Sequence, residues 1–285
     1  MDKGVVMWNL ADTHSGSTVG LMLPEKMPLV DGGYYTPSFP QDIIWKQFEE
    51  DIRITKKLRR NKNLFVVVNG DPVEGLHHSL LGVISPRVID HESAHVRVMK
   101  YALKKVGFDA AAGDKIFYVG GTPSHCGRGN ISTNRISAVL KAEPKDLKRE
   151  IFWHGVLKLY VNGVCMIYGH QVFSASSRTW LWENNVRYFL KSYLMDCVGD
   201  GVDVPDYMVG AHRHRYVDSG DVIWKKWRAR GIITPSYQGK TDWVYKVLPI
   251  VTSDVGSSWI IISKNGDHEH VVNKVEVEQD KGLVY

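Results

Sequence analysis

The sequence is poor in cysteine, with three residues in 285 and no Cys-x-x-Cys pair: Cys126, Cys165 and Cys197. An odd, widely spaced set argues against a disulfide framework or a zinc-thiolate site and favours a reducing compartment. No segment approaches the roughly 18 consecutive apolar residues of a membrane-spanning helix. Residues 1–6 hold too short an apolar stretch for a signal peptide. We therefore expect a cytoplasmic protein with no membrane partner.

Charge of one sign is not in large excess either. Lys and Arg number 36 against 31 Asp and Glu, which gives a formal net charge of +5 and a pI near 8.9. This mildly basic balance permits a phosphate-rich partner without requiring one. The hydrophobic fraction of 44% and the charged fraction of 24% are ordinary for a globular protein. Because there is no internal repeat or break in composition, we expect residues 1–285 to form a single domain.

Apolar runs and turn signals predict an α/β protein. Continuous apolar stretches, typical of buried strands, are separated by segments whose apolar residues recur at helical spacing. Strands are expected at residues 4–10, 64–68, 115–119 and 206–209, and helices at 40–60, 86–106, after Asn130 and at 176–198. A hairpin is expected within residues 151–168, since Asn162-Gly163 is a strong tight-turn signal. We expect residues 216–285, which alternate strand-like pieces with turns, to complete a second sheet packed on the first.

Metal-ligating residue types follow five of these expected strands. They are Asp12 and His14, Asp71, His125, His170, and His212 and His214. In an open α/β sheet the carboxyl ends of strands converge on one crevice, so these side chains can meet. One such Asp alone is usually a cap or turn residue, and one such His is usually structural. The joint series favours a site with oxygen and nitrogen ligands and no thiolate, which suits Mn, Fe or Zn.

The last pair of histidines favours two metals over one. His212 and His214 stand at i and i+2, so on an extended backbone their side chains point to opposite faces. One cation can bind both side chains only where the chain bends. Two adjacent cations fit the pair more naturally.

Together these residues resemble the calcineurin-like metallophosphoesterase superfamily, whose pattern is DxH, GD, GNH(D/E), GH and GHxH. The matching segments are Asp12-x-His14, Gly70-Asp71, Gly169-His170 and Ala211-His212-x-His214, spread over residues 5–215. The resemblance implies a two-sheet β-sandwich flanked by helices, with a two-metal centre between strand-end loops. Mn is the metal we expect first, with Fe, Zn or Mg as alternatives.

The resemblance also implies roles for the individual ligands. Asp71 would bridge both ions and would have to be a carboxylate to hold two cations together. Asp12, His14 and His214 would complete one site, while His170 and His212 would belong to the other. Two divalent ions about 3.5–4 Å apart neutralise phosphate oxygens and lower the pKa of a water, which makes hydrolysis of a phosphodiester the expected reaction.

Two departures from the family pattern stand out. Ala211 replaces the usual Gly before HxH, a small change. The GNH(D/E) segment is missing, and residues 121–126 read Gly-Thr-Pro-Ser-His-Cys instead. His125 is the natural counterpart of the family's catalytic His, which protonates the leaving oxygen. Alternatively, His125 replaces the missing Asn as a ligand, and His77, His78 or water supplies the proton.

The substrate is expected to be nucleic acid, as in the similar DNA-repair exonuclease branch and its bacteriophage-encoded relatives. The basic balance favours this, and so do arginines that could contact phosphate, which are Arg128, Arg178 and Arg187. A small-molecule or phosphoprotein phosphoesterase is the alternative within enzymes. Outside enzymes, the alternatives are a non-catalytic scaffold that keeps the fold and a module that only binds nucleic acid.

Overall fold

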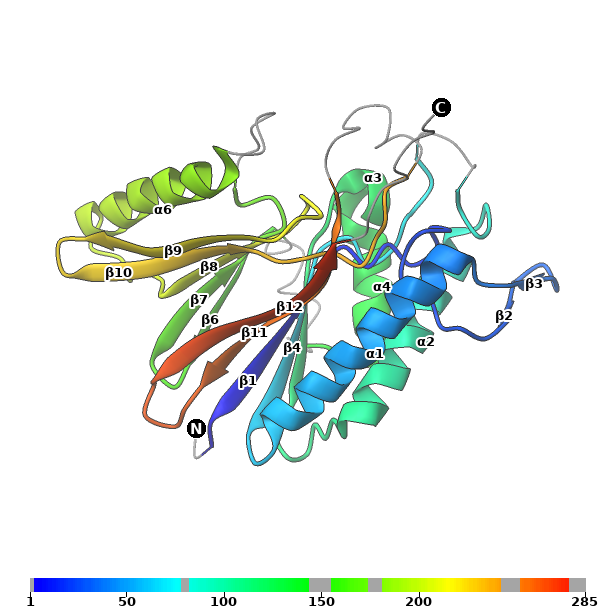
Figure 1. Ribbon diagram of the computed structural model, residues 1–285, viewed down its shortest axis with the longest axis horizontal. Coiled ribbons are helices and arrows are strands. Elements are labelled where there is room, and N and C mark those ends of the chain that lie inside the picture. Colours follow the sequence, from blue (N-terminus) through cyan, green and yellow to red (C-terminus); the bar gives the residue numbers. More distant parts are fainter. Residues whose placement is uncertain (1–2, 78–81, 144–154, 174–180, 242–251, 277–285) are drawn as a thin grey trace, which may run out of the picture.

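Two five-stranded sheets pack against each other, with helices on their outer faces (Figure 1). The computed structural model describes residues 3–77, 82–143, 155–173, 181–241 and 252–276. One apolar core lies between the sheets, a second lies between the first sheet and its helices, and a third lies under the helix of the second sheet. The predicted α/β architecture of two sheets flanked by helices is confirmed.

The first sheet has the order β12-β11-β1-β4-β5. Its strands are β1 (Val5–Leu10), β4 (Asn63–Asn69), β5 (Lys115–Val119), β11 (Asp254–Ile262) and β12 (His268–Glu276). The first three run parallel, as in the prediction, and β11 and β12 are antiparallel additions. Every residue of β1 is buried, because the sheet is covered on both faces and β1 lies at its centre.

The second sheet has the order β6-β7-β8-β10-β9. Its strands are β6 (Leu157–Val161), β7 (Val164–Tyr168), β8 (Tyr207–Gly210), β9 (Val217–Trp224) and β10 (Trp227–Ile233). The predicted turn joins β6 to β7, and Asn162 and Gly163 take positive φ values of 49° and 88° there. Residues 151–154 of the predicted hairpin lie outside the described residues.

The prediction that residues 216–285 complete the second sheet is wrong for the last two strands. Strands β9 and β10 do join that sheet, whereas β11 and β12 extend the first. The reason is that β4 pairs with only one edge of β1, so the other edge of β1 is open to another strand. Strand β11 pairs along that edge from Val5 opposite Ile262 to Asn9 opposite Ser258, and its apolar residues are buried there.

The helices match the predicted ones closely. They are α1 (Phe39–Arg59), α2 (Val88–Val106), α4 (Ile131–Leu140) and α6 (Trp182–Gly199), with a short α3 (Pro123–Cys126) and a 3-10 turn η1 (Arg128–Asn130). Helices α1 and α2 cover the first sheet and α6 covers the second (Figure 1). Residues 176–180, where α6 was expected to begin, lie outside the described residues. Among the described helices, none has the length and apolar character needed to cross a membrane.

The segment before α1 forms a small hairpin of its own. Its strands are β2 (Met27–Pro28) and β3 (Tyr34–Tyr35), which project from the right of the molecule in Figure 1. Helix α1 then begins with a capping box, in which Ser38 accepts from the Gln41 amide and the Gln41 side chain accepts from the Ser38 amide. Basic residues in its last turn suit the helix dipole.

A buried polar network ties α1 to the first sheet. Tyr237 is fully buried, and its hydroxyl donates to the Asp51 carboxylate and lies 2.6 Å from Ser257 Oγ. Asn273 Nδ2 donates to the same carboxylate at 2.6 Å. Burial raises the pKa of Asp51 to about 7 in spite of these donors. The amide of Tyr237 also donates to the carbonyl of Asp12 at 3.0 Å, so this network reaches the strand-end loops.

Replacing Tyr237 with Phe should lower the free energy of unfolding by about 1–3 kcal/mol, because a buried carboxylate loses a hydrogen-bond donor. Urea unfolding followed by circular dichroism measures the change. Tyr34→Phe is the matched control, since Tyr34 is 71% exposed and should change stability little. Equal stability of the two variants would show that the network contributes nothing at Tyr237.

Candidate metal centre

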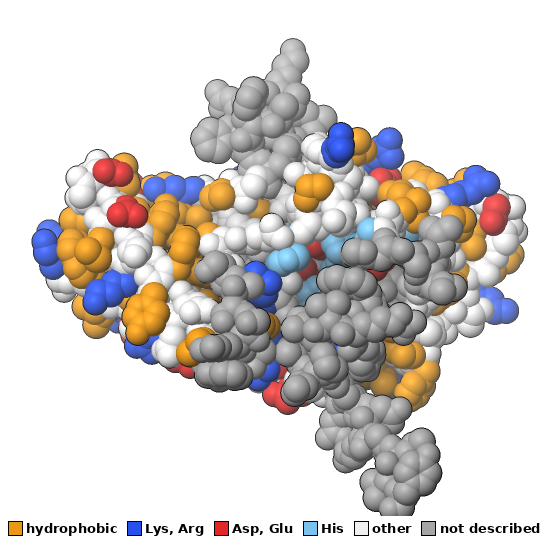
Figure 2. Space-filling model, turned by 90° about the horizontal axis from the view of Figure 1, so that it is seen from above, with side chains coloured by type: hydrophobic (Ala, Val, Ile, Leu, Met, Phe, Trp, Pro, Cys, Tyr) orange, Lys and Arg blue, Asp and Glu red, His pale blue; other side chains and the backbone are white. Residues whose placement is uncertain are grey.

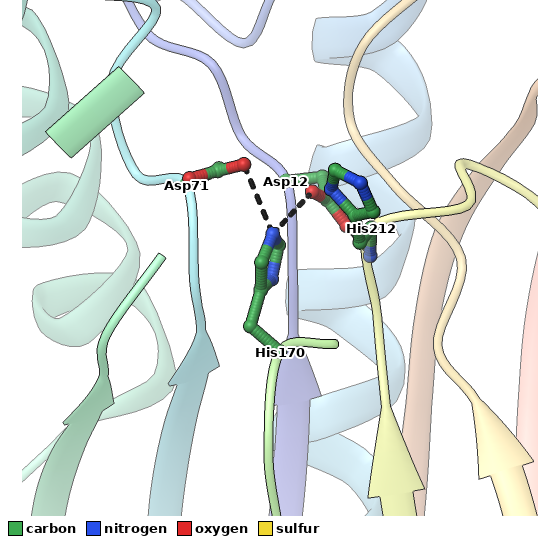
Figure 3. A group of neighbouring side chains, drawn as sticks. All are labelled: Asp12, Asp71, His170 and His212. Atoms are coloured by element: carbon green, nitrogen blue, oxygen red, sulfur yellow. Dashed lines mark hydrogen bonds and ion pairs between the residues drawn. The ribbon is translucent and has the colours of Figure 1, made fainter. Parts of the chain in front are cut away.

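All six predicted ligands lie together where strands of both sheets end. Asp12 follows β1, Asp71 follows β4, His170 follows β7, and His212 and His214 follow β8. Two groups have ligand atoms within 4.8 Å of one another: Asp12, Asp71, His170 and His212, and Asp12, His14 and His214. Figure 3 shows the first group above the strand ends. In the view from above, histidines and acidic side chains lie together near the middle of the face (Figure 2).

The Asp12 carboxylate lies at the centre of this arrangement. Its Oδ1 atom is 3.7 Å from Nε2 of His14, 3.7 Å from Nε2 of His170 and 3.5 Å from Nε2 of His214. Asp12 is fully buried, and within the described part of the chain neither its Oδ1 nor Nε2 of His14 has a hydrogen-bond partner. Buried polar atoms are rarely left without partners. Orphaned oxygen and nitrogen atoms that converge in this way fit a divalent cation.

Asp71 is held differently from Asp12. Its Oδ1 accepts from the amide of Thr122 at 2.7 Å, and its Oδ2 lies 2.9 Å from Nε2 of His170. The Thr122 hydroxyl also donates to Asp71, at 3.2 Å from Oδ1 and 3.1 Å from Oδ2, so Thr122 holds this carboxylate through both its amide and its side chain. In the described geometry Asp12, and not Asp71, belongs to both groups. The bridging role of Asp71 stays a prediction.

The other ring nitrogens of two histidines are fixed by acceptors. Nδ1 of His170 lies 2.9 Å from the carbonyl of Asn69, and Nδ1 of His14 lies 2.9 Å from Oε2 of Glu74. A carbonyl only accepts, so Nδ1 of His170 carries a proton, and Nε2 faces the carboxylates of Asp71 and Asp12. Outer partners of this kind set the tautomer and orientation of metal-binding histidines.

The sequence reasoning missed Glu74. This buried carboxylate stands three residues after Asp71 and contacts His14, His77 and Gln238. The Gln238 amide donates to Oε2 at 2.7 Å, and Nε2 of His77 lies 3.2 Å from Oε1. The only signal in the sequence was an acidic residue close after Gly70-Asp71, and only the fold shows that it faces His14.

The backbone of the site is strained. Five of the six predicted ligands have positive φ, which is uncommon outside glycine: Asp12 (47°), His14 (40°), Asp71 (41°), His212 (73°) and His214 (51°). Each such residue costs about 1–3 kcal/mol and persists only where its surroundings hold it. Gly70 also has positive φ, and a Cβ there would lie 2.1 Å from Nδ1 of His170. Strain concentrated on the ligands is typical of a functional site.

The carboxylates and histidines of the site stabilise one another's charged forms. Burial would raise the pKa of Asp12 and Asp71, but neighbouring histidines, His170 first, hold both well below the ordinary range. Burial would lower the pKa of His14, yet the neighbouring carboxylates of Asp12 and Glu74 raise it to about 10. The pKa of His170 rises to about 9 in the same way, through Asp12 and Asp71. The pocket is therefore anionic enough to hold positive charge deep inside the protein.

His125 lies beside the two groups. Its ring is at right angles to those of His14 and His77, with centroids 4.3 Å and 4.1 Å away, and it forms a third candidate group with His14 and Glu74. Nδ1 lies 2.6 Å from the Glu74 carbonyl and so carries the proton, which leaves Nε2 for other partners. Burial and the nearby His14 lower the pKa of His125 to about 4. His78, the other predicted proton source, lies outside the described residues.

The predicted phosphate-contacting arginines are not part of these groups. Arg128 is exposed on η1, and Arg187 is exposed on α6, where it lies 3.4 Å from Glu183. Arg178 lies outside the described residues. Sequence reasoning did not single out Arg213, which stands between His212 and His214 and is only partly exposed.

A cavity of about 230 Å³ adjoins His170. It is also lined by Gly120, Gly121, Gly155, Val156, Gly169, Gln171 and Val172.

Comparison with known proteins identifies no family for the chain. No protein-family model and no curated protein sequence matches it. Among solved structures, Chaetomium thermophilum Vps29 is similar at a TM-score of 0.35 and 8% identity, covering 95% of this chain and 97% of that one. A hypothetical protein from Thermus thermophilus is similar at a TM-score of 0.37 and 10% identity, covering 95% and 99%. Likenesses this low carry no conclusion about function.

Replacing Glu74 with Gln should weaken Mn²⁺ binding about 10- to 100-fold, because His14 loses the carboxylate that fixes its tautomer. Titration calorimetry on protein stripped of metal measures the affinity. Glu183→Gln, which changes an exposed carboxylate on α6, should bind Mn²⁺ like the wild type. Wild-type affinity in the Glu74 variant would contradict a supporting role for this residue.

Proposed function

We propose that the protein is a metal-dependent phosphoesterase whose centre holds two divalent ions, with Mn²⁺ as the first candidate. The observation that carries the proposal is the buried Oδ1 atom of Asp12, which has no hydrogen-bond partner among the residues that the structure describes and lies within 3.7 Å of three imidazole nitrogens. The other oxygen, Oδ2, accepts from the backbone amide of His212 at 2.8 Å. A merely structural carboxylate at this depth would be expected to have both oxygens satisfied. The resemblance of the motif series to calcineurin-like metallophosphoesterases supports the same class.

The proposed ligands divide into two sets that share Asp12. His14 and His214 would complete one set, and Asp71, His170 and His212 the other. Ions bound there would supply positive charge to a phosphate ester and lower the pKa of a water. The protein's own part is to hold the ligands in place, with Glu74 orienting His14 and the Asn69 carbonyl orienting His170.

His125 is the proposed proton donor to the leaving oxygen. Its Nδ1 is engaged by the Glu74 carbonyl, so Nε2 is the atom available to a substrate. Donation from Nε2 would require the doubly protonated ring, which the negative charge of a bound phosphate would favour. The competing role, a ligand in place of the missing Asn, uses the same atom. The two roles differ in what the side chain does to metal affinity, and this difference can be measured.

We propose nucleic acid as the substrate, cleaved by a nuclease of the DNA-repair exonuclease or bacteriophage type. The net charge of +5 favours a polyanion, and the partly exposed Arg213 lies in the chain between two proposed ligands. A guanidinium there can contact phosphate oxygens next to the cations. A small-molecule or phosphoprotein phosphoesterase would share the centre but would not need a longer basic surface.

The missing Asn favours one alternative of another class, a scaffold that keeps the fold without a working centre. Six ligand side chains that converge argue against it, because a scaffold has no need of them. The positive φ values of five proposed ligand residues argue against it too, since backbone strain of this kind is expected to persist at sites where it serves a function. A scaffold would bind no stoichiometric metal after purification.

Replacing Asp12 with Asn should abolish Mn²⁺-dependent hydrolysis of bis(p-nitrophenyl) phosphate, with a loss on the order of a hundredfold or more. A neutral amide removes the shared carboxylate from both groups. Release of p-nitrophenol measures the rate, and circular dichroism checks the fold. Asp42→Asn, in the first turn of α1, is the control expected to keep wild-type activity. Retained hydrolysis in the Asp12 variant would refute the assignment.

Replacing His125 with Asn should slow cleavage of a dinucleotide on the order of 100-fold or more while slowing the p-nitrophenyl diester far less. An alkoxide needs a proton to leave, whereas p-nitrophenolate does not. Mn²⁺ affinity should stay unchanged, as it should in the control His268→Asn on β12. Weaker Mn²⁺ binding and equal slowing of both substrates would instead make His125 a ligand.

A further inference from the structure

The tip of the β9–β10 hairpin carries aromatic and basic side chains that the metal centre does not use. We call Trp224, Lys225, Lys226 and Trp227 the hairpin cluster. The two tryptophans lie opposite each other across the hairpin, so their rings share one face of the sheet. Nζ of Lys225 lies 4.5 Å from the centre of the Trp224 ring, and Nζ of Lys226 lies 5.0 Å from that of Trp227. The tip therefore presents indole and ammonium groups together.

The positive charge of the hairpin cluster is not offset by the rest of the fold. Neighbouring Arg228 is paired with Asp221 at 2.8 Å, whereas the described part of the chain gives Lys225 and Lys226 no ion pair. Lys225 also has a positive φ of 53°, where two-residue turns usually use Asn or Gly. A lysine kept at a strained position, with a second lysine beside it, points to an anionic ligand.

The hairpin leads directly away from the candidate metal centre. Strand β9 begins at Val217, three residues after His214, and its tip forms the left end of the molecule in Figure 1. The seven steps from Val217 to Trp224 span about 23 Å at roughly 3.3 Å per residue. A strand whose bases are stacked about 3.4 Å apart, as in a helix, would cover that length with about seven nucleotides. In Figure 2, hydrophobic and basic side chains lie together at the left of the face that shows the histidines.

We propose that the hairpin cluster binds single-stranded nucleic acid that runs along β9 from the candidate metal centre. Bases would stack on Trp224 and Trp227, and phosphates would contact Lys225 and Lys226. This inference deepens the proposed function and rests on it for the position of the strand's other end.

The setting of the tryptophans favours bases over a lipid surface. Trp224 packs against the core beneath α6, and Trp227 is 36% exposed, so the rings form a fixed platform at the side of the sheet. Stacking on bases requires such a platform, because a flat ring must be held at a set angle. Insertion into a membrane would instead require apolar rings that stand clear of the fold.

Binding of labelled oligothymidines of about 4 and about 16 nucleotides, followed by fluorescence anisotropy in EDTA, tests the proposal. Wild type should bind the longer strand more tightly, because only that strand reaches both ends of β9. Lys225→Glu with Lys226→Glu should weaken this binding on the order of tenfold and reduce the slope of log affinity against log salt by about 1.4. Trp224→Ala and Trp227→Ala should each weaken it about fivefold.

Lys56→Glu with Lys57→Glu, in the last turns of α1, is the matched charge control and should bind like the wild type. Unchanged binding in the hairpin lysine variant would overturn the proposal whether or not the tryptophan variants fold. Loss of binding to phosphatidylserine vesicles alone, with DNA binding intact, would overturn it in favour of a membrane. Binding in EDTA needs no catalysis, so it tests this inference separately from the proposed function. Binding that depends on the hairpin cluster, in a protein without hydrolytic activity, would support this inference and refute the proposed function.

Discussion

The structure depends on one buried carboxylate, that of Asp12, lying among imidazoles delivered by the other sheet. Asp12 comes from β1, whereas His170 and His214 come from loops after β7 and β8. The Asp12 backbone is held from both sides, since its amide donates to the carbonyl of Gly70 and its carbonyl accepts from Tyr237. Charges at this depth are costly unless they are paired. Binding of a cation here would therefore be coupled to the packing of the two sheets, because both would use the same few atoms.

The sequence could predict the candidate ligands because each of them lies just after the end of a strand, which is a local feature. An apolar run followed by Asp or His needs no knowledge of distant contacts, and parallel strands bring such ends to one edge. The sheet that β11 and β12 join is not determined by such local features. Ser258 pairs with Asn9 across 249 positions of sequence, and an apolar run does not tell which sheet it will join. The fold class and the convergence of the six side chains were therefore predictable, whereas the sheet order at the C-terminal strands was not.

The partners of the supporting residues were beyond prediction for a related reason. Glu74, Thr122 and Gln238 have no pattern of their own, and each acquires its role from a contact far along the chain. Gln238 reaches Glu74 across 164 positions, and Thr122 reaches Asp71 across 51. Thr122 is the instructive case, because the missing Asn looked like a lost ligand in the sequence. In the fold the segment that stands there instead supplies Thr122, which donates to Asp71 through both its amide and its hydroxyl.

The strained loops are held by a neutral buried histidine. The Thr13 hydroxyl donates to the carbonyl of Pro72 at 2.9 Å, so Nδ1 of His95, 3.0 Å away, must donate to Thr13. Nε2 of His95 then accepts from the Tyr118 hydroxyl at 2.9 Å. Burial lowers the pKa of His95 to about 3, which keeps the ring neutral and this direction of hydrogen bonds fixed. The chain of bonds joins the loops after β1 and β4 to α2 and β5, so the ligand backbone is over-determined before any cation binds. A site built in this way would lose little conformational entropy on taking up a cation.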